Sequence, residues 1–288
     1  MIRETAPAKV NLVLQVGDVR ADGLHELCSL FASLELADDV AVELGDDPSG
    51  DAGSGGAGPD EIRCPGVTGP NLASRALDEL RTALAGNLPP LRVTIDKRIP
   101  VAAGLGGGSA DAAAVLRAAN RLAGDPLDAG ALRRIGERVG ADVPSQVNPR
   151  HALVTGAGEN VEPLGLPPMA LVLISQDEGL STADVYRAAD EIGSTRTLLD
   201  PAALRALAAR PLAELAGALE NDLEPAALHL RPALSSELAA LRSAGALAAR
   251  VTGSGPTTFG VFPDRQTADQ AATALSSKSV VTALRRQP

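Results

Sequence analysis

The chain is 288 residues long, enough to bury one large core or two ordinary ones. Hydrophobic residues make up 45% of it and charged residues 22%, which is typical of globular proteins and excludes a disordered chain. The formal net charge is −10 and no run of Lys or Arg forms a basic stripe, which argues against nucleic acid as a partner.

Targeting and redox signals favour a cytoplasmic protein. The longest apolar runs, such as Ala170–Ile174, are too short to cross a bilayer, so no membrane association is expected. The first residues lack the basic segment and apolar stretch of a secretion signal. Cys28 and Cys64 lie far apart and fit neither a disulfide framework nor a metal-ligand spacing. The acidic charge favours solubility and leaves monomer and homodimer open.

The first elements are read from hydrophobic periodicity. Alternation over Val10–Val16 predicts a half-buried strand, followed by a turn at residues 21–23 and a further strand at Val40–Leu44. Residues 45–60 are rich in Gly, Asp, Ser and Pro and predict a mobile hairpin tip or insertion. A helical period follows over Asn71–Ala85.

The middle of the chain predicts a strand, a glycine-rich loop and two helices. The strand is Leu91–Ile95, the loop is Gly104–Ser109, and the helices are Ala110–Ala123 and Ala129–Val139. Beyond a soft boundary at residues 161–168, the remaining elements predict a separate α+β layer. These elements are Ala170–Ile174, Pro201–Leu219, Pro225–Ala244, Arg250–Thr252, Thr258–Phe262, Thr267–Leu275 and Ser279–Leu284.

The glycine-rich loop is the strongest functional signal. Its glycines let the backbone turn sharply and approach a ligand, and the first N–H groups of the following helix face an anion. Ser109 is placed either to cap that helix or to offer a hydroxyl to phosphate or its metal. No Gly-Lys pair exists for a Walker loop, and Ser109 stands where a dinucleotide fingerprint needs glycine. Three consecutive glycines exceed what a tight turn requires, which favours a phosphate site.

Three segments in order resemble the GHMP kinases, the family of galactokinase and of homoserine, mevalonate and phosphomevalonate kinases. Pro100–Ala110 is similar to their phosphate loop, Ala6–Leu12 to their N-terminal motif and Val251–Phe259 to their C-terminal glycine motif. The resemblance implies an α+β fold of two domains, with a ribosomal S5 domain 2-like N-terminal domain (1–162) and a ferredoxin-like C-terminal domain (163–288). It also implies ATP and Mg²⁺ as cofactors and an active site in the cleft between the domains.

Narrower features resemble one branch of that family. Residues 22–27, Lys97–Pro100, Gly140–Pro144 and Asn221–Glu224 are similar to the members that phosphorylate the 2-hydroxyl of cytidine diphosphate–methylerythritol in the non-mevalonate route to isoprenoid precursors. The substrate would be a small molecule that carries a cytidine diphosphate group. Two alternatives stay open: another small-molecule kinase of homoserine or phosphomevalonate type, and a non-catalytic nucleotide-binding relative.

The resemblance also implies roles for individual residues. Asp142 aligns with the catalytic aspartate and Lys9 with its partner lysine; an aspartate can accept the hydroxyl proton and a lysine can stabilise the developing alkoxide. Expected ATP-binding residues are Asn71, Lys97, Pro100, Gly104, Leu105, Gly106, Gly107, Gly108 and Ser109. Expected substrate-binding residues are Asn11, Leu24, His25, Asp142, Thr182, Tyr186, Gly253, Ser254 and Gly255. Mg²⁺ would be held chiefly by the ATP phosphates, with Ser109 as a contact, and no protein ligand set is assigned.

Each of these residues has a structural alternative. Asp142 alone could cap a helix, Lys9 alone could be a surface charge, and Tyr186 alone could be a packing residue on a helix. Lys9 is one of three lysines in an Arg-rich chain, and Arg is a poor substitute for a compact ammonium. The family usually has an aromatic residue where this chain has Leu24, so one wall of the expected cytosine site would lack a stacking ring. Tyr186 would form the opposite wall.

Overall fold

The computed structural model describes residues 1–45, 60–67, 71–275 and 278–286. The chain divides into two compact units. The first unit comprises residues 1–7, 37–99 and 107–149, and the second comprises 8–36, 100–106 and 150–288. The domain boundary expected near residues 161–168 stays a prediction. The predicted tip at 45–60 lies, from 46 to 59, outside the described residues.

Six strands form a mixed sheet. They are β1 (Ile2–Val19), β2 (His25–Leu44), β3 (Glu61–Arg63), β4 (Leu91–Asp96), β5 (Ala152–Gly156) and β6 (Asn160–Pro163). The order is β3-β4-β2-β5-β6, and β1 pairs with β2. Strand β3 runs parallel to β4, whereas β2 pairs antiparallel with both β4 and β5. The long strands β1 and β2 each contribute residues to both units.

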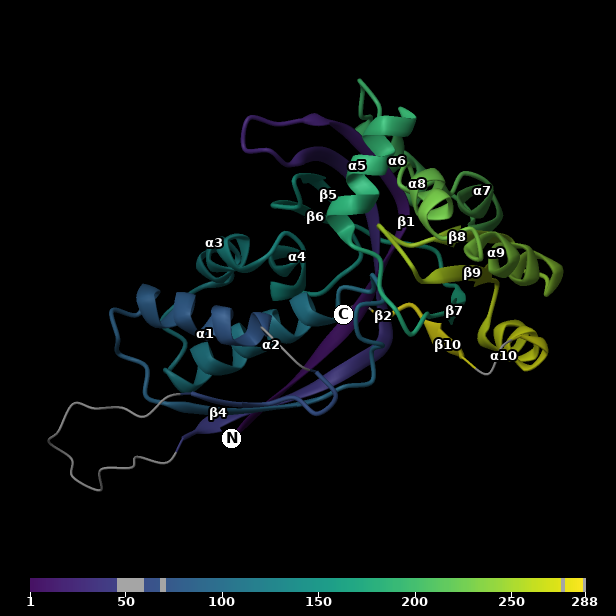
Figure 1. Ribbon diagram of the computed structural model, residues 1–288. Helices are drawn as coiled ribbons and strands as arrows, with labels where there is room; N and C mark the ends of the chain where they lie inside the picture. The colour runs from purple at the N-terminus through teal and green to yellow at the C-terminus, as the bar shows by residue number, and fades with distance from the viewer. Residues whose placement is uncertain (46–59, 68–70, 276–277, 287–288) are drawn as a thin grey trace, which may run out of the picture. The chain divides into compact units, whose positions relative to one another are not determined.

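The first unit packs helices against its part of the sheet. Its helices are α1 (Leu72–Ala83), α2 (Gly107–Leu122), α3 (Ala129–Val139) and α4 (Val143–Val147). Figure 1 shows α1 and α2 side by side over β4. Leu77 and Leu80 of α1 share one core with Val93 and Ile95 of β4. Alanines fill most buried positions of α2, and their small side chains let neighbouring helices approach closely.

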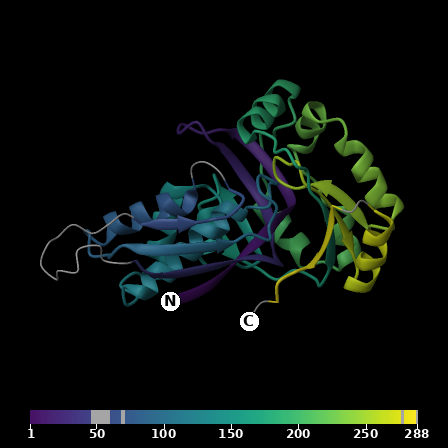
Figure 2. The same cartoon turned by 60° about the horizontal axis from the view of Figure 1, so that its bottom comes forward.

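The second unit contains a four-stranded antiparallel sheet of β7 (Ala170–Ile174), β8 (Ala248–Val251), β9 (Thr258–Phe262) and β10 (Ser279–Ala283). Its order is β10-β7-β9-β8, the arrangement of a ferredoxin-like layer, which confirms the expected C-terminal architecture. The helices of this unit are α5 (Thr182–Ile192), α6 (Pro201–Ala208), α7 (Leu212–Gly217), α8 (Glu224–Leu230), α9 (Leu234–Ser243) and α10 (Arg265–Ala274). Apolar residues of α9 and α10 share one core with β7, β8 and β9, and Figure 2 shows this helical layer beside the sheet.

Two expected helices are wrong because each contains a proline. The helix expected over 201–219 is split into α6 and α7, with Pro211 directly before α7. The helix expected over 225–244 is split into α8 and α9, with Pro232 between them. A proline inside a helix removes a backbone hydrogen bond and clashes with the preceding turn, so each helix ends before it.

The strand predicted at Val10–Val16 is part of the longer β1, and it is buried on both faces. The expectation of a half-buried strand is therefore wrong. Its polar face carries Lys9, Asn11 and Gln15, which are only 6%, 3% and 6% exposed. Buried polar groups of this kind need internal partners, and those partners define the site described below.

Helix α3 and strands β7 and β9 have the bounds predicted from the sequence, whereas α4, α5, β3, β5 and β6 were not predicted. Among the described residues, no helix is both long enough and apolar enough to cross a membrane.

Candidate active site

The N-terminal motif and the first half of the glycine loop meet in the second unit. The backbone N–H of Lys9 donates to the carbonyl oxygen of Leu105 over 3.0 Å. A Cβ atom built on Gly106 would lie 3.0 Å from Cγ of Lys9, and Gly106 has φ of +70°. Only glycine combines this left-handed backbone with so close an approach of the lysine stem. The loop is therefore shaped around Lys9.

The C-terminal glycine motif joins the same cluster. A Cβ atom on Gly104, where φ is +75°, would lie 2.6 Å from the carbonyl oxygen of Gly255 and 3.3 Å from that of Thr252. The Thr252 hydroxyl accepts from the backbone N–H of Asn11 over 3.0 Å. A Cβ atom on Gly253 would lie 3.2 Å from Oδ1 of Asn11. Three segments that are far apart in the sequence thus come together around Lys9 and Asn11.

The Lys9 ammonium is held in one orientation. Its Nζ donates to Oδ1 of Asn11 over 2.8 Å and lies 4.6 Å from the ring centroid of Phe31, a cation–π contact. The amide of Asn11 in turn donates to Ser29 over 2.9 Å, and the Ser29 hydroxyl donates to the carbonyl oxygen of Val13 over 2.6 Å. This chain of bonds provides the partners of the buried polar face of β1 and contradicts the alternative of Lys9 as a surface charge.

In the first unit, Lys97 is bound by two buried carboxylates. Its Nζ donates to Asp38 over 2.5 Å and to Asp111 over 2.7 Å. The other oxygen of Asp38 accepts the backbone N–H groups of Arg98 and Ile99, over 2.5 and 2.8 Å. Asp38 therefore fixes the segment directly before the glycine loop.

The same lysine contacts the second half of the loop. A Cβ atom on Gly107 would lie 3.2 Å from Nζ of Lys97, so a side chain there would displace the ammonium. Burial disfavours that ammonium, but Asp111 and Asp38 outweigh the cost and raise the pKa of Lys97. Burial raises the pKa of Asp111 to about 6, although Lys97 acts in the opposite direction. No hydrogen-bond partner for Oδ1 of Asp111 is found among the described residues.

Helix α2 begins inside the glycine run. Its first residue is Gly107, so Ser109 lies in the first helical turn and the alternative of Ser109 as the cap is wrong. The cap of α1 is Asn71, whose Oδ1 accepts from the backbone N–H of Ala73 over 2.9 Å. Leu72, the next residue, would lie 3.7 Å from a Cβ atom on Gly108. The starts of α1 and α2 are therefore neighbours within the first unit.

Asp142 precedes α4 but does not cap it. The residue occupies the N-cap position, yet its side chain makes no capping hydrogen bond. The Ser145 hydroxyl instead donates to the backbone carbonyl oxygen of Asp142 over 2.7 Å. The capping alternative is thereby contradicted for this half-buried carboxylate, which belongs to the first unit.

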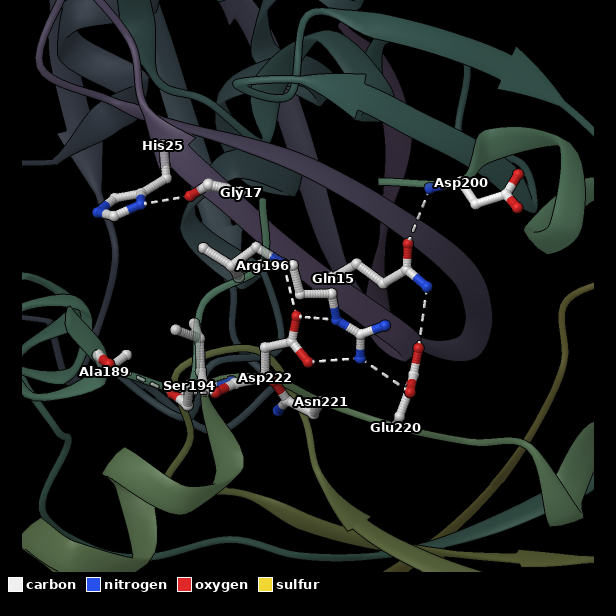
Figure 3. Close-up of polar contacts among 12 residues, drawn as sticks. Gln15, Gly17, His25, Ala189, Ser194, Arg196, Asp200, Glu220, Asn221 and Asp222 are labelled. Carbon is white, nitrogen blue, oxygen red and sulfur yellow. Dashed lines mark hydrogen bonds and ion pairs between the residues drawn. The ribbon is translucent and has the colours of Figure 1, made fainter. Parts of the chain in front are cut away.

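His25 and Tyr186 form a ring pair in the second unit. Their centroids are 5.0 Å apart with the planes tilted by 36°. Nδ1 of His25 donates to the carbonyl oxygen of Gly17 over 2.9 Å, as Figure 3 shows, and Nε2 lies 3.3 Å from a carboxylate oxygen of Asp190. Leu24 is 52% exposed, and no described contact joins it to the ring pair.

Thr182 and Ser254 also come together in this unit, because their hydroxyl oxygens are 3.1 Å apart. Thr182 is the first residue of α5, and Ser254 follows Gly253 in the C-terminal glycine motif. Pro100 starts the turn that leads into the loop.

Sequence reasoning missed the partners that orient the predicted residues, namely Phe31, Asp38 and Asp111. Phe31 could have been noticed as one of three phenylalanines in a chain with 1% aromatic residues. Asp111 stands among alanines on a helix that starts with a glycine run, where an acidic residue on the buried face is unusual. No local signal marks Asp38.

Comparisons with known proteins identify the family. The family model described as GHMP kinases N terminal domain matches residues 71–149, and that described as GHMP kinases C terminal matches 203–281. A 4-diphosphocytidyl-2-C-methyl-D-erythritol kinase of Anaeromyxobacter dehalogenans is 42% identical over 95% of this chain and 85% of the relative. That of Methylobacterium radiotolerans is 42% identical over 96% of this chain and 94% of the relative.

Solved structures show the same fold. The crystal structure of a 4-(cytidine 5'-diphospho)-2C-methyl-D-erythritol kinase has a TM-score of 0.81 at 33% identity, over 99% of this chain and 100% of the other. A homoserine kinase from Cytophaga hutchinsonii has a TM-score of 0.72 at 20% identity, over 99% and 94% of the two chains, and shows the fold alone. The chain therefore belongs to the GHMP kinase family, in the branch whose relatives are named 4-diphosphocytidyl-2-C-methyl-D-erythritol kinases.

Proposed function

We propose that this chain transfers the γ-phosphoryl group of ATP to the 2-hydroxyl of 4-diphosphocytidyl-2-C-methyl-D-erythritol. The hydroxyl oxygen forms a bond to the γ-phosphorus, the bond from that phosphorus to the bridging oxygen of ATP breaks, and the products are the 2-phosphate and ADP. The names of relatives at 42% identity and of a solved structure at 33% identity support this acceptor.

The catalytic roles fall to Asp142 and Lys9. The Asp142 carboxylate accepts the proton that leaves the 2-hydroxyl, a role supported by its place in the Gly140–Pro144 segment that resembles this branch of the family. The Lys9 ammonium stabilises the charge that develops on the acceptor oxygen, and its bond to Asn11 and contact with Phe31 hold it in place before the reaction. Phosphoryl transfer depends mainly on such positioning.

Backbone N–H groups at the start of α2 bind the ATP phosphates. Gly106, Gly107 and Gly108 bring these groups close to the anion, and the dipole of α2 favours negative charge there. Asn71, Lys97 and the segment Pro100–Leu105 form the rest of the nucleotide site.

Mg²⁺ would neutralise charge on the transferring phosphate when it is bound. Among the described residues, no group of three or more His, Cys, Asp or Glu side chains could hold a metal ion. Mg²⁺ commonly takes most of its ligands from phosphates and water, so the ATP phosphates would hold it. Ser109, in the first turn of α2, is placed to offer one hydroxyl oxygen.

The acceptor side uses the ring pair and the C-terminal glycine motif. His25 hydrogen-bonds the cytosine, Tyr186 stacks on one face, and Leu24 covers the other by apolar contact. The remaining acceptor contacts come from Asn11, Thr182, Gly253, Ser254 and Gly255.

The convergence of the Lys9–Asn11 pair with both glycine motifs is the observation that carries the proposal. The test measures ADP release from Mg-ATP with the cytidine substrate, homoserine, mevalonate and phosphomevalonate. We expect turnover with the cytidine substrate alone. Turnover confined to another alcohol would discard the cytosine site, and no turnover with any of the four would contradict the proposal.

The variant Asp142→Asn tests whether the Asp142 carboxylate takes part in catalysis. We expect turnover to fall by about 100-fold or more, the usual contribution of a general base. Asp128→Asn is the matched control, because Asp128 caps α3 by accepting from the backbone N–H of Ala131, and Asn caps helices equally well. Near-wild-type turnover of Asp142→Asn would contradict its proposed role as acceptor of the hydroxyl proton.

A further inference from the structure

Residues 220–222 lie beside β1 as a short extended segment. The backbone N–H of Leu14 donates to the carbonyl oxygen of Glu220 over 2.9 Å, and that of Asp222 donates to the carbonyl oxygen of Leu14 over 3.0 Å. This forms a parallel bridge between Leu14 and Asn221. Successive side chains of an extended segment point to opposite sides, so Asn221 and Asp222 act on different neighbours.

Asp222 binds the backbone of β1 together with Arg196. Its carboxylate accepts Nε and Nη2 of Arg196, both over 2.6 Å, and also the backbone N–H of Val16 over 2.9 Å. The backbone N–H of Arg196 donates to the carbonyl oxygen of Val16 over 2.7 Å. The backbone N–H and carbonyl oxygen of Val16 are thus bonded by Asp222 and Arg196, as a neighbouring strand would bond them. Figure 3 shows the ion pair between Arg196 and Asp222.

The position of Val16 determines the position of the ring pair. The next residue, Gly17, supplies the carbonyl oxygen that accepts from Nδ1 of His25. The His25 ring packs beside Tyr186, so the contacts run from the ion pair through the backbone of Val16 and Gly17 to these two rings of the proposed cytosine site. A shift of Val16 along β1 would carry the Gly17 carbonyl with it and release His25.

Asn221 binds the other part of the acceptor site. Its amide nitrogen donates to the carbonyl oxygens of Val251 and Gly253, both over 2.8 Å, and its Oδ1 accepts from the backbone N–H of Leu223 over 2.9 Å. The residue is 7% exposed. Only a side chain with both donors and an acceptor satisfies these three bonds, so an aspartate of the same shape would face two carbonyl oxygens without a donor.

The guanidinium of Arg196 is enclosed by further bonds. Its Nη2 also lies 2.8 Å from Oε2 of Glu220, and Oε1 of Glu220 accepts from the amide of Gln15 over 2.9 Å. Oε1 of Gln15 accepts from the backbone N–H of Asp200 over 3.3 Å, which closes the network drawn in Figure 3. A planar, bidentate pair held from several sides fixes orientation as well as distance.

We propose that Asn221, Asp222 and Arg196 are positioning residues for the acceptor substrate. Asp222 and Arg196 act through Val16 and Gly17 on His25, and Asn221 acts through the turn at Gly253. This inference rests on the proposed function, since it assigns His25 and Gly253 to the acceptor. The bonds of Asp222 and Arg196 do not involve the glycine loop proposed to bind ATP, so changes at these two residues should affect the acceptor and not ATP. Asn221 holds the turn at Gly253, which lies against Gly104 of that loop, so its variant should affect both substrates.

The test compares isosteric and conservative variants on the purified full-length chain. Asp222→Asn and Asn221→Asp keep shape and change hydrogen bonding, and Arg196→Lys keeps charge but loses the bidentate pair. KM for the cytidine acceptor, KM for ATP, kcat and the midpoint of thermal unfolding are measured for each. The control is Arg205→Lys, because Arg205 makes the same bidentate bonds to Glu162, over 2.7 and 2.6 Å, with about half of each side chain exposed.

We expect KM for the acceptor to rise about tenfold or more in the three variants, because a small misplacement of binding groups costs that much. KM for ATP should stay within about twofold of wild type in Asp222→Asn and Arg196→Lys, and Arg205→Lys should change neither value. An unchanged acceptor KM in the three variants, or an equal rise of both KM values in Asp222→Asn and Arg196→Lys, would overturn the positioning role.

The same measurements distinguish a failure of the proposed function from a failure of the positioning role. If Asp222→Asn fails to fold, Arg196→Lys carries the comparison, because it keeps a cation beside the buried carboxylate. Wild-type protein that does not turn over the cytidine acceptor refutes the proposed function. Wild-type turnover with variants of unchanged KM refutes the positioning role alone.

Discussion

The contact between the two glycine motifs predicts that Gly104→Ala lowers both the free energy of unfolding and the turnover. The new methyl group would lie 2.6 Å from the carbonyl oxygen of Gly255, closer than two such atoms can approach. The backbone at Gly104 has φ of +75°, where a Cβ atom costs about 1–2 kcal/mol by itself. Forcing an extra methyl group against fixed backbone adds about 1–3 kcal/mol. The free energy of unfolding should therefore fall by about 2–5 kcal/mol, and turnover should fall as the loops separate.

Gly124→Ala provides the matched control. Gly124 has φ of +86°, but a Cβ atom there would meet nothing within 4 Å. The control variant has the backbone strain without the steric clash. Its free energy of unfolding should therefore fall by about 1–2 kcal/mol, and its turnover should stay unchanged. Urea unfolding gives both free energies, and ADP release gives turnover. If the two variants lose the same stability within about 0.5 kcal/mol and both keep wild-type turnover, the loops do not touch as described.

Three further predictions concern single side chains. The raised pKa of Asp111, about 6 against about 3.9 in an unfolded chain, means that the folded chain holds an extra proton between these values. The free energy of unfolding of the wild type should therefore fall by about 2–3 kcal/mol as pH rises from 4 to 6. Urea unfolding of Asp111→Asn should lack this fall, and parallel plots of stability against pH for the two proteins would contradict the prediction. Tyr186→Ala should raise KM for the cytidine acceptor, and an unchanged KM would remove its stacking role. Burial raises the pKa of the Cys28 thiol to about 11, so a thiol reagent should label Cys64 first and Cys28 only after unfolding; rapid labelling of Cys28 in folded protein would refute its burial.

Local signals in the sequence predicted much of the fold. The bounds of α3, β7 and β9 follow from short periodic runs between turn residues, and the glycine loop was placed between a strand and a helix as observed. The errors at Pro211 and Pro232 arose because helical periodicity continues across both prolines. The apolar residues keep a helical spacing across each proline, but the backbone helix is interrupted there.

The partners of the site residues could not be predicted, because tertiary packing selects them. Lys97 was expected near the nucleotide, but its two carboxylates lie 59 and 14 residues away in the chain. Arg196 and Asp222 are separated by 26 residues and carry no motif that joins them. Residue type and spacing predict the chemistry of a site, whereas the orientation of each group depends on contacts between distant segments.

The long sequence separation between β1 and its bonded partners has a consequence for folding. Within the second unit, Lys9 bonds to Leu105, Leu14 to residues 220 and 222, and Asn11 to Thr252, 241 residues later. During synthesis, Asn11 must therefore wait for 241 further residues before this partner exists. Such long-range pairing slows folding and leaves an alternating apolar strand exposed meanwhile. The bonds that hold Lys9 and Asn11 in place should therefore be among the last to form.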